Sequence, residues 1–464
     1  MILRKNEMDL CNGPLFGNII RFTVPIILMN ALQLLYNAAD MIVVGRYNGE
    51  AAVAAVGATA TFISLIVNVF IGFSIGINVC ISNYIGAKKN NELTEGVSTS
   101  VILAVISGLL VALIGILSSA PLLRLMGTPD DIFDMSLLYV RVYFLGAPAN
   151  MLYNFISAIL RAKGDTKRPL YILAASGLIN VILNCVFVAI FDMSVFGVAL
   201  ATIISQYVSA LLCLVVISRE CGACRLDFKH LTVNKQSLVK MISLGLPSGI
   251  QGSVFSLSAM VIQSAINSFD TSVVAGNTAA GNIDTFSYIA FNAFQATVVT
   301  FVAQNYGAKN MRRVERSYFI CICAAVSVAI VSGWTIYAFG DKLLSIYLPG
   351  EEAAISYGII RLKYICIPYF LLAMMDVTVG VLRGLGCSLG PTVISMLGAC
   401  GIRLLWIFTV FAKCRSLDIL YLSFPLAWLA TFVSLFVMYL VVKKKRDKDL
   451  LTIDVEKSVC CEIS

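Results

Sequence analysis

The chain has 464 residues, of which 59% are hydrophobic and only 13% are charged, and its formal net charge is +8. A typical soluble domain has about 25% charged residues, so this composition excludes an ordinary soluble protein and predicts an all-α polytopic membrane protein. The Lys and Arg residues lie in short segments between apolar runs, which indicates membrane topology and not nucleic-acid binding.

The first apolar segment, residues 16–45, contains one acidic residue, Asp40, and one internal proline, Pro25. At about 1.5 Å of rise per residue it exceeds the roughly 30 Å hydrocarbon core, so we expect a tilted or bent span. A charge at membrane depth costs on the order of 2.5–3.5 kcal/mol and usually faces a water-filled cavity. Asp40 therefore either lines such a cavity or lies solvated at the outer interface. Pro25 permits a kink that would act as a hinge and reposition Asp40.

Twelve spans are predicted along the chain, separated by short breaks with glycine, proline and charged residues. They lie near residues 15–44, 52–82, 96–120, 132–160, 169–191, 195–218, 238–267, 273–304, 317–339, 353–382, 391–412 and 419–442.

Basic residues concentrate in the breaks on one side of the predicted membrane and in the sequence KKKRDKD at 443–449. The opposite breaks are mostly acidic, for example at Asp130, Asp131 and Asp134. The positive-inside rule then places both termini in the cytoplasm, as an even number of spans also requires.

An internal repeat relates the two halves of the chain at an offset of about 221–222 residues. TVP, ending at Pro25, matches GLP, ending at Pro247. YIGAKKN at 84–90 matches NYGAKNM at 305–311, and ILRAKGDTKRP at 159–169 matches VLRGLGCSLGP at 381–391. The repeat predicts two parallel six-helix units, an organisation found in transporters whose halves rock around a central site. The predicted parts are an N-terminal lobe (1–218), a cytoplasmic linker (219–240), a C-terminal lobe (241–442) and a basic cytoplasmic tail (443–464).

These motifs, in this order and across nearly the whole chain, resemble the MATE (multidrug and toxic compound extrusion) family of cation-coupled antiporters. The detail is most similar to its bacterial DinF-like branch. The matching residues are Asp40-x-x-x-Val44-Gly45, Gly86-Ala87-Lys88 and Arg161-x-x-Gly164-Asp165-Thr166-Lys167-x-Pro169, with echoes at Gly307-Ala308-Lys309 and Arg383-Gly384-x-Gly386. The resemblance implies a MATE-like fold, a multi-pass protein of the cell (inner) membrane, and coupling through an acid in the first helix.

The expected coupling-cation site, for H⁺ or Na⁺, surrounds Asp40. Asn180 and Asn184 are four residues apart and share a helix face. Together with Thr202 and Asn154 they offer neutral oxygen ligands, which hard cations favour. Some relatives carry a second acid where Asn184 stands, so the choice between Na⁺ and H⁺ stays open. The other interpretation is that these side chains only hydrogen-bond neighbouring helices.

The second half contains two further intramembrane acids, Asp376 and Asp284, which either take part in coupling or form a helix–helix hydrogen bond in the protonated state. Cargo contacts are predicted for side chains close to Asp40 in the first span. These substrate-cavity residues are Gln33, Tyr36 and Asn37.

The sequence contains no phosphate-binding GxxxxGK[ST] loop and no recognisable catalytic set, so we expect no enzyme activity. One CxxC pair and a single histidine are too few for a zinc site, and no metal or cofactor is expected beyond the coupling ion. The sequence therefore predicts a monomeric secondary transporter that exports small organic, often cationic and amphipathic compounds or drugs across the lipid bilayer, with no nucleic-acid partner. The alternative is a flippase for a lipid-linked precursor, which we expect to need more intramembrane Arg and Lys than the few present, such as Arg21 and Arg403.

Overall fold

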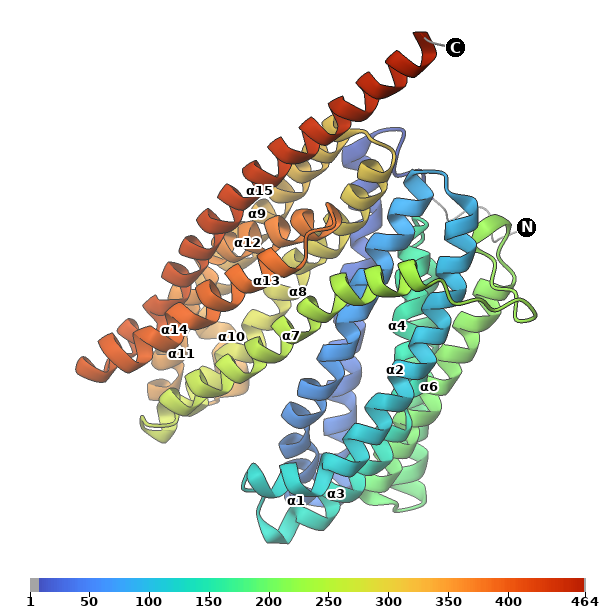
Figure 1. Ribbon diagram of the computed structural model, residues 1–464. Helices are drawn as coiled ribbons and strands as arrows, with labels where there is room; N and C mark the ends of the chain where they lie inside the picture. Colours follow the sequence, from blue (N-terminus) through green and yellow to red (C-terminus); the bar gives the residue numbers. More distant parts are fainter. Residues whose placement is uncertain (1–7, 463–464) are drawn as a thin grey trace. The chain divides into compact units, whose positions relative to one another are not determined.

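A computed structural model describes residues 8–462, with side chains as far as residue 446, and its regular elements in this range are all helical (Figure 1). This confirms the predicted all-α fold. In chain order, the first half contains α1 Leu15–Gly86, α2 Asn90–Leu125, α3 Asp130–Leu145, α4 Ala147–Ala162, α5 Lys167–Asn184, the π-helical segment Cys185–Ile190, α6 Ser194–Ser218 and the 3-10 turn Gly222–Cys224. The second half contains α7 Lys235–Ile266, α8 Thr271–Gly307, α9 Met311–Ala338, α10 Gly340–Tyr347, α11 Glu352–Cys366, α12 Tyr369–Gly384, α13 Leu389–Ser395, the π-helical segment Met396–Gly401, α14 Ile402–Trp406, the π-helical segment Ile407–Phe411 and α15 Leu417–Glu462.

The helices account for the predicted spans. Nine helical stretches among the described residues are long and apolar enough to cross a membrane, or up to eleven when each of two bent helix pairs counts as one span. The 72-residue α1 contains the first two predicted spans, because its backbone leaves helical geometry at Gly49 (φ 77°, ψ −173°). The structure is thus consistent with twelve spans. The short helix α10 was not predicted, since eight residues are too few to give a span signal.

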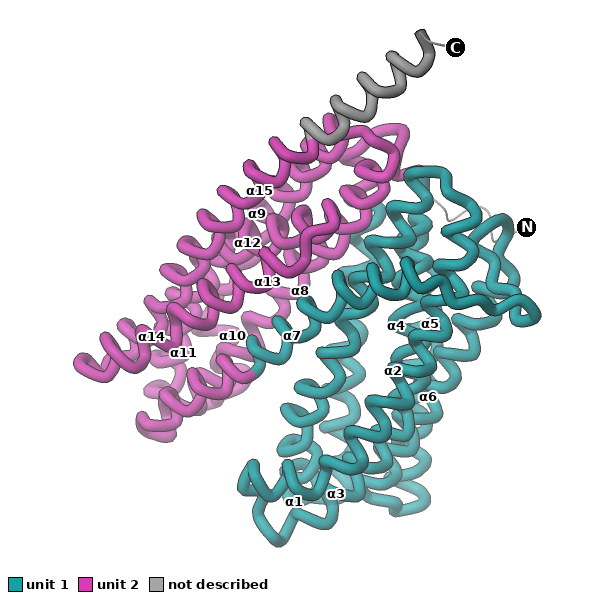
Figure 2. The backbone as a smooth tube through the Cα atoms, in the orientation of Figure 1, with its two compact units in different colours: residues 1–9, 20–256 teal, residues 10–19, 257–464 magenta. Residues whose placement is uncertain are grey.

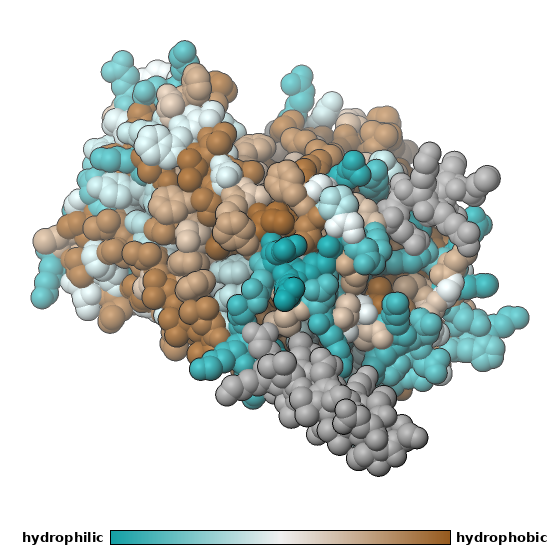
Figure 3. Space-filling model, turned by 90° about the horizontal axis from the view of Figure 1, so that it is seen from above, coloured by the Kyte–Doolittle hydropathy of each residue, from teal (hydrophilic) through white to brown (hydrophobic). Residues whose placement is uncertain are grey.

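Many outward-facing side chains of these helices are large and apolar. Figure 3 shows broad hydrophobic areas on the surface, and the exposed residues include Leu117 (70%), Phe319 (68%) and Phe408 (72%). Exposed apolar area of this extent is costly in water and is the normal surface of a helix in lipid. The chain is a multi-pass membrane protein.

The sequence repeat is also present in local geometry, at the same offset of about 222 residues. The pair α3 and α4 is bent by 46°, and the pair α11 and α12 by 43°. Lys88 and Lys309, at matching positions of the two Gly-Ala-Lys motifs, have φ values of 56° and 58°. One π-helical segment of each half, Cys185–Ile190 and Ile407–Phe411, occupies the same place in the repeat.

The chain forms two compact units, shown in different colours in Figure 2. Unit 1 comprises Met1–Asp9 and Ile20–Ser256, and unit 2 comprises Leu10–Ile19 and Leu257–Ser464. Within each unit, glycines let helices approach closely. A Cβ on Gly108 of α2 would lie 2.4 Å from the Pro148 Cα of α4, so only glycine fits there.

The predicted tail begins inside a helix, because α15 continues to Glu462 and its sequence from 443 contains neither glycine nor proline. Lys443 pairs with Glu315 at 2.8 Å, and the Arg446 guanidinium lies 5.4 Å from the centre of the Tyr306 ring. The start of the tail is therefore attached to unit 2. Residues 1–7 of the predicted N-terminal lobe and 463–464 of the tail lie outside the described residues.

Candidate functional site

Unit 1 contains a cavity of about 130 Å³ between α1, α4, α5 and α6. Most of its lining side chains are polar, which is unusual for helices that are otherwise apolar. The lining residues are Gln33, Tyr36, Asn37, Asp40, Asn150, Tyr153, Asn154, Leu173, Ser176, Gly177, Asn180, Thr202, Ser205, Gln206 and Ser209. The cavity contains one ionisable carboxylate, that of Asp40.

A chain of hydrogen bonds starts at Asp40. Its Oδ1 accepts a hydrogen bond from Nδ2 of Asn184, which is fully buried. The same Nδ2 lies 3.3 Å from Oδ1 of Asn180, and Nδ2 of Asn180 donates to Oγ1 of Thr202 at 3.4 Å. Helices α1, α5 and α6 are thereby connected through four polar side chains, all of which the sequence had grouped as one candidate site.

Helix geometry explains this grouping. Asn180 and Asn184 are four residues apart, so they lie on the same face of α5. Asn184 is the last residue of α5, and the π-helical segment Cys185–Ile190 begins immediately after it. π-Helical segments are rare overall, and many of those that occur lie at functional sites.

Tyr36 is fixed by a glycine of the opposite helix. An added Cβ on Gly177 would lie 1.9–2.5 Å from three atoms of the Tyr36 ring, so the ring rests directly on the α5 backbone. The Tyr36 hydroxyl donates to the carbonyl oxygen of Ala174 at 3.3 Å. Gln33 and Asn37, the other predicted cargo residues, also line the cavity.

Asn154 lines the cavity but bonds within its own helix, where its Nδ2 donates to both the main-chain oxygen and Oδ1 of Asn150 at 2.9 Å. Sequence reasoning missed several lining residues of α6, although Thr202, Ser205, Gln206 and Ser209 recur at the spacing of one helix face. That polar stripe in an apolar span was the available signal.

The acids of unit 2 have separate surroundings. Asp376 of α12 is buried, and its Oδ2 accepts a hydrogen bond from Nδ2 of Asn292 of α8 at 3.0 Å. The same Asn292 nitrogen donates to the Tyr288 hydroxyl at 3.1 Å. Among the described residues, Asp376 therefore has a neutral donor and no ion pair, a setting similar in kind to that of Asp40.

Asp284, by contrast, is ion-paired. Its Oδ2 lies 2.9 Å from one terminal nitrogen and 3.2 Å from Nε of Arg361 in α11. The other terminal nitrogen of Arg361 donates to Oδ1 of Asn277 at 2.6 Å, and this oxygen also accepts from the Tyr421 hydroxyl at 2.9 Å. The positive charge of Arg361 thus compensates the Asp284 carboxylate, a pairing that the sequence did not reveal.

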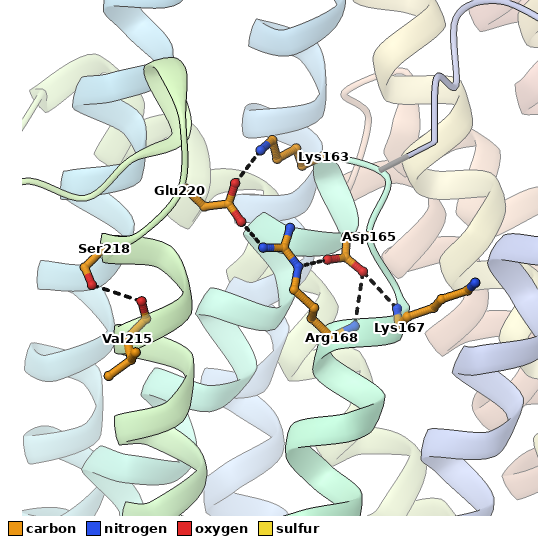
Figure 4. A network of polar contacts seen from close by, with 7 residues as sticks. All are labelled: Lys163, Asp165, Lys167, Arg168, Val215, Ser218 and Glu220. Atoms are coloured by element: carbon orange, nitrogen blue, oxygen red, sulfur yellow. Dashed lines mark hydrogen bonds and ion pairs between the residues drawn. The ribbon is translucent and has the colours of Figure 1, made fainter. Parts of the chain in front are cut away.

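A second charge network lies at the end of unit 1 that contains the Arg-x-x-Gly-Asp-Thr-Lys motif (Figure 4). Oδ1 of Asp165 accepts from the backbone N–H groups of Lys167 (3.0 Å) and Arg168 (3.1 Å) and so caps the start of α5. Its Oδ2 pairs with Arg168, which also pairs with Glu220. Glu220 pairs in addition with Lys163. The network connects the α4–α5 turn to the residues that follow α6.

Among the described residues, no group of three or more His, Cys, Asp or Glu side chains is placed to hold a metal ion. The chemistry of the unit 1 site is therefore that of one carboxylate surrounded by neutral amides and hydroxyls. Such a group can hold one monovalent positive charge, whether a proton, a metal ion or an organic cation.

Comparison with known proteins agrees with this picture. The MatE family model matches residues 25–186 and again residues 247–409, one match for each half of the repeat. The chain is 28% identical over 435 residues to the "Probable multidrug resistance protein YoeA" of Bacillus subtilis, covering 92% of this chain and 93% of that protein. It is 26% identical over 398 residues to the "Probable multidrug resistance protein NorM" of Thermotoga maritima, covering 83% of each.

The fold also matches solved structures. A crystal structure described as MATE in complex with MaL6 superimposes with a TM-score of 0.87 at 21% identity, covering 95% of this chain and 98% of the other. An outward-facing multidrug resistance MATE family transporter gives the same TM-score and coverage. Two matches of the family model, which together span more than half of the sequence, show that this chain belongs to the MatE family.

Proposed function

We propose that this protein is a secondary active transporter that exports organic, often cationic and amphipathic compounds in exchange for H⁺ or Na⁺. The observation that carries the proposal is the Asp40 carboxylate in the polar cavity of unit 1, hydrogen-bonded to Asn184. The names of the relatives, which are multidrug resistance and export proteins, support the same class of cargo.

A single carboxylate is enough to couple the movement of the ion to that of the exported compound. A proton or Na⁺ on Asp40 neutralises the charge that attracts a cationic compound, so ion and cargo exclude each other at this site. Asn180 and Thr202 bring further oxygen atoms toward the cavity. Oδ1 of Asn184 is buried and accepts no hydrogen bond from the described residues, so it is a further oxygen that a cation could engage.

The proposal includes a topology and a movement. Both termini lie in the cytoplasm by the distribution of Lys and Arg, and the two six-helix halves alternate the access of the cavity between the two sides of the membrane. Pro25, inside α1 and on the same helix as Asp40, is the proposed hinge.

The test is efflux of ethidium from liposomes containing the purified protein, with a pH gradient and a Na⁺ gradient imposed separately. We expect one of the gradients to drive efflux, and Asp40→Asn to abolish it. Asp131→Asn, which removes an exposed acid at the start of α3, is the matched control and should transport like the wild type. Gradient-driven efflux that is unchanged in Asp40→Asn would overturn the assignment of Asp40, and efflux without any gradient would overturn antiport.

A further inference from the structure

Unit 2 contains a positive charge inside a membrane span that has no carboxylate partner among the described residues. Arg403 lies in the short helix α14, between the π-helical segments Met396–Gly401 and Ile407–Phe411. Its guanidinium carbon is 4.3 Å from the centre of the Phe424 ring and 5.6 Å from that of Trp428, both in α15. Arginine at membrane depth is costly, and cation–π contacts of about 0.5–2 kcal/mol compensate only part of that cost.

Two buried N–H donors in this cluster have no acceptor within the part of the chain that the structure describes. They are Nε of Arg403 and Nε1 of Trp428. The other tryptophan nearby behaves differently, because Nε1 of Trp406 donates to the carbonyl oxygen of Ile419 at 2.9 Å. Buried donors are satisfied in the great majority of cases, and an unmet one costs about 1–3 kcal/mol.

The repeat places this cluster where unit 1 has its cavity. At an offset of about 222 residues, Phe424 corresponds to Thr202, and Trp428 corresponds to Gln206. Two polar cavity residues of α6 are thus replaced by aromatic rings in α15, whereas Arg403 stands at the position of Val181, which does not line the unit 1 cavity. The Trp428 ring also packs against Tyr369, with ring centres 5.8 Å apart, which extends the apolar wall.

From these contacts we propose that Arg403, with Trp428 and Phe424, forms a binding site for the anionic head of an amphipathic molecule, a phosphate or carboxylate. The oxygen atoms of the head accept from Arg403 Nε and Trp428 Nε1, and the apolar part lies against the aromatic rings. Arg403 as a whole residue retains intermediate exposure, and in this proposal the head enters from its exposed part to reach the two buried donors. The site is independent of the proposed cation coupling in unit 1, because it shares no residue with that cavity.

The ligand comes either from the bilayer, as a phospholipid head, or from the pool of compounds that the protein handles. Binding is measured by fluorescence on the purified full-length chain. The sequence has three tryptophans, so Trp334→Phe with Trp406→Phe leaves Trp428 as the single reporter. Dodecyl phosphate and dodecyltrimethylammonium, which have the same tail and opposite charge, are titrated in a neutral detergent.

We expect dodecyl phosphate to change the Trp428 emission saturably and dodecyltrimethylammonium not to compete with it. Arg403→Gln should weaken binding at least about ten-fold, and Arg403→Lys should weaken it less, because a point charge remains. Lys363→Gln is the matched control, since Lys363 is an exposed cation 5.5 Å from the centre of the Tyr364 ring in the same unit. Binding of dodecyl phosphate is also measured in nanodiscs that contain phosphatidylglycerol and in nanodiscs that contain phosphatidylcholine. If phosphatidylglycerol blocks this binding, the lipid is the source of the ligand. Unblocked binding identifies a soluble amphiphile.

Equal binding of the cationic probe, or an Arg403→Gln variant that binds dodecyl phosphate as tightly as its parent, would overturn the proposal and leave Arg403 as a packing residue. If Arg403→Gln does not fold, as judged by gel filtration, the competition between the two probes in the parent and the affinity of Arg403→Lys still decide the question.

Discussion

Asn184, the last residue of α5, donates a hydrogen bond from its side-chain amide to the carboxylate of Asp40 in α1. The two residues are separated by 144 positions in the chain. The contact connects the acid proposed for coupling to a buried amide whose same nitrogen also lies 3.3 Å from Oδ1 of Asn180. Because Asn184 has no carboxyl group, the site contains a single acid, and substitutions of Asn184 test what that acid requires.

Asn184→Ala should reduce gradient-driven efflux about ten-fold. A hydrogen bond to a charged group contributes about 1.5–3 kcal/mol, and its loss leaves Asp40 without the donor that orients it. Efflux of ethidium from liposomes, measured beside the wild type, checks this. Asn267→Ala removes an exposed amide whose Oδ1 accepts a hydrogen bond from Nε2 of Gln263 at 2.8 Å, and it should have no effect. Equal losses in both variants would mean that the Asn184 contact has no special role.

Asn184→Asp should increase Na⁺-driven relative to H⁺-driven efflux. A second carboxylate beside Asp40 repels the first unless a cation lies between them, and hard cations favour such oxygen pairs. The ratio of efflux rates under the two separate gradients is the measurement. Asn150→Asp adds a carboxylate to the α4 side of the same cavity, at a residue that bonds Asn154, and should leave the ratio closer to that of the wild type. A ratio unchanged in Asn184→Asp would exclude a cation between the two positions.

Gly177→Ala should displace Tyr36 from the cavity wall. The added methyl group would lie within 1.9–2.5 Å of the Tyr36 ring, and overpacking of this kind costs about 1–3 kcal/mol. We expect weaker transport together with a lower thermal unfolding temperature of the purified protein. Gly57→Ala, in the second half of α1, meets nothing within 4 Å and should be neutral or stabilising by up to about 1 kcal/mol. Similar behaviour of the two variants would show that the Tyr36 ring can move freely.

Much of this architecture could be predicted from the sequence because the signals are local. The length of the apolar runs gives the spans, and three motif pairs give the repeat. The polar residues on α1 and α5 stand out because intramembrane amides and acids are rare. By contrast, Gln206 and Ser209 of α6 belong to a polar stripe in an apolar span, but only the tertiary structure shows that this stripe lines the same cavity as Asp40.

The pairing of Asp284 with Arg361 was hidden for the same reason. The two residues are 77 positions apart, and their contact depends on the close approach of α8 and α11. That approach requires glycine at 276, where a Cβ would lie 2.2 Å from the carbonyl oxygen of Ala354. The arginine donors around Phe424 and Trp428 likewise depend on how α14 packs against α15, which no periodicity reveals.

Glu220→Gln should destabilise the protein by about 3 kcal/mol. Glu220 pairs with both Arg168 and Lys163, and its replacement removes the carboxylate shared by these two cations while Arg168 keeps Asp165. The exposed pair of Lys89 with Glu92 (2.9 Å) is the matched control, because its side chains are 55% and 41% exposed. Glu92→Gln should leave the thermal stability close to that of the wild type, because solvent screens an exposed pair. Thermal unfolding of the purified variants compares the two, and equal shifts would contradict a structural role for the network in Figure 4.

Asp284→Asn and Arg361→Gln should each be strongly destabilising, by about 3–5 kcal/mol, because each leaves an uncompensated buried charge. The double variant should lose less than the sum of the two, since no charge remains, and the difference measures their coupling. Its dependence on the H⁺ or Na⁺ gradient should match that of the wild type, because the Asp284 carboxylate is already held by Arg361 at 2.9 Å. Asp376→Asn is the comparison, since the hydrogen-bond donor to that acid among the described residues is the neutral Asn292. A folded double variant that transports without any gradient dependence would instead assign Asp284 to coupling, and its arginine would then be the group that releases the ion.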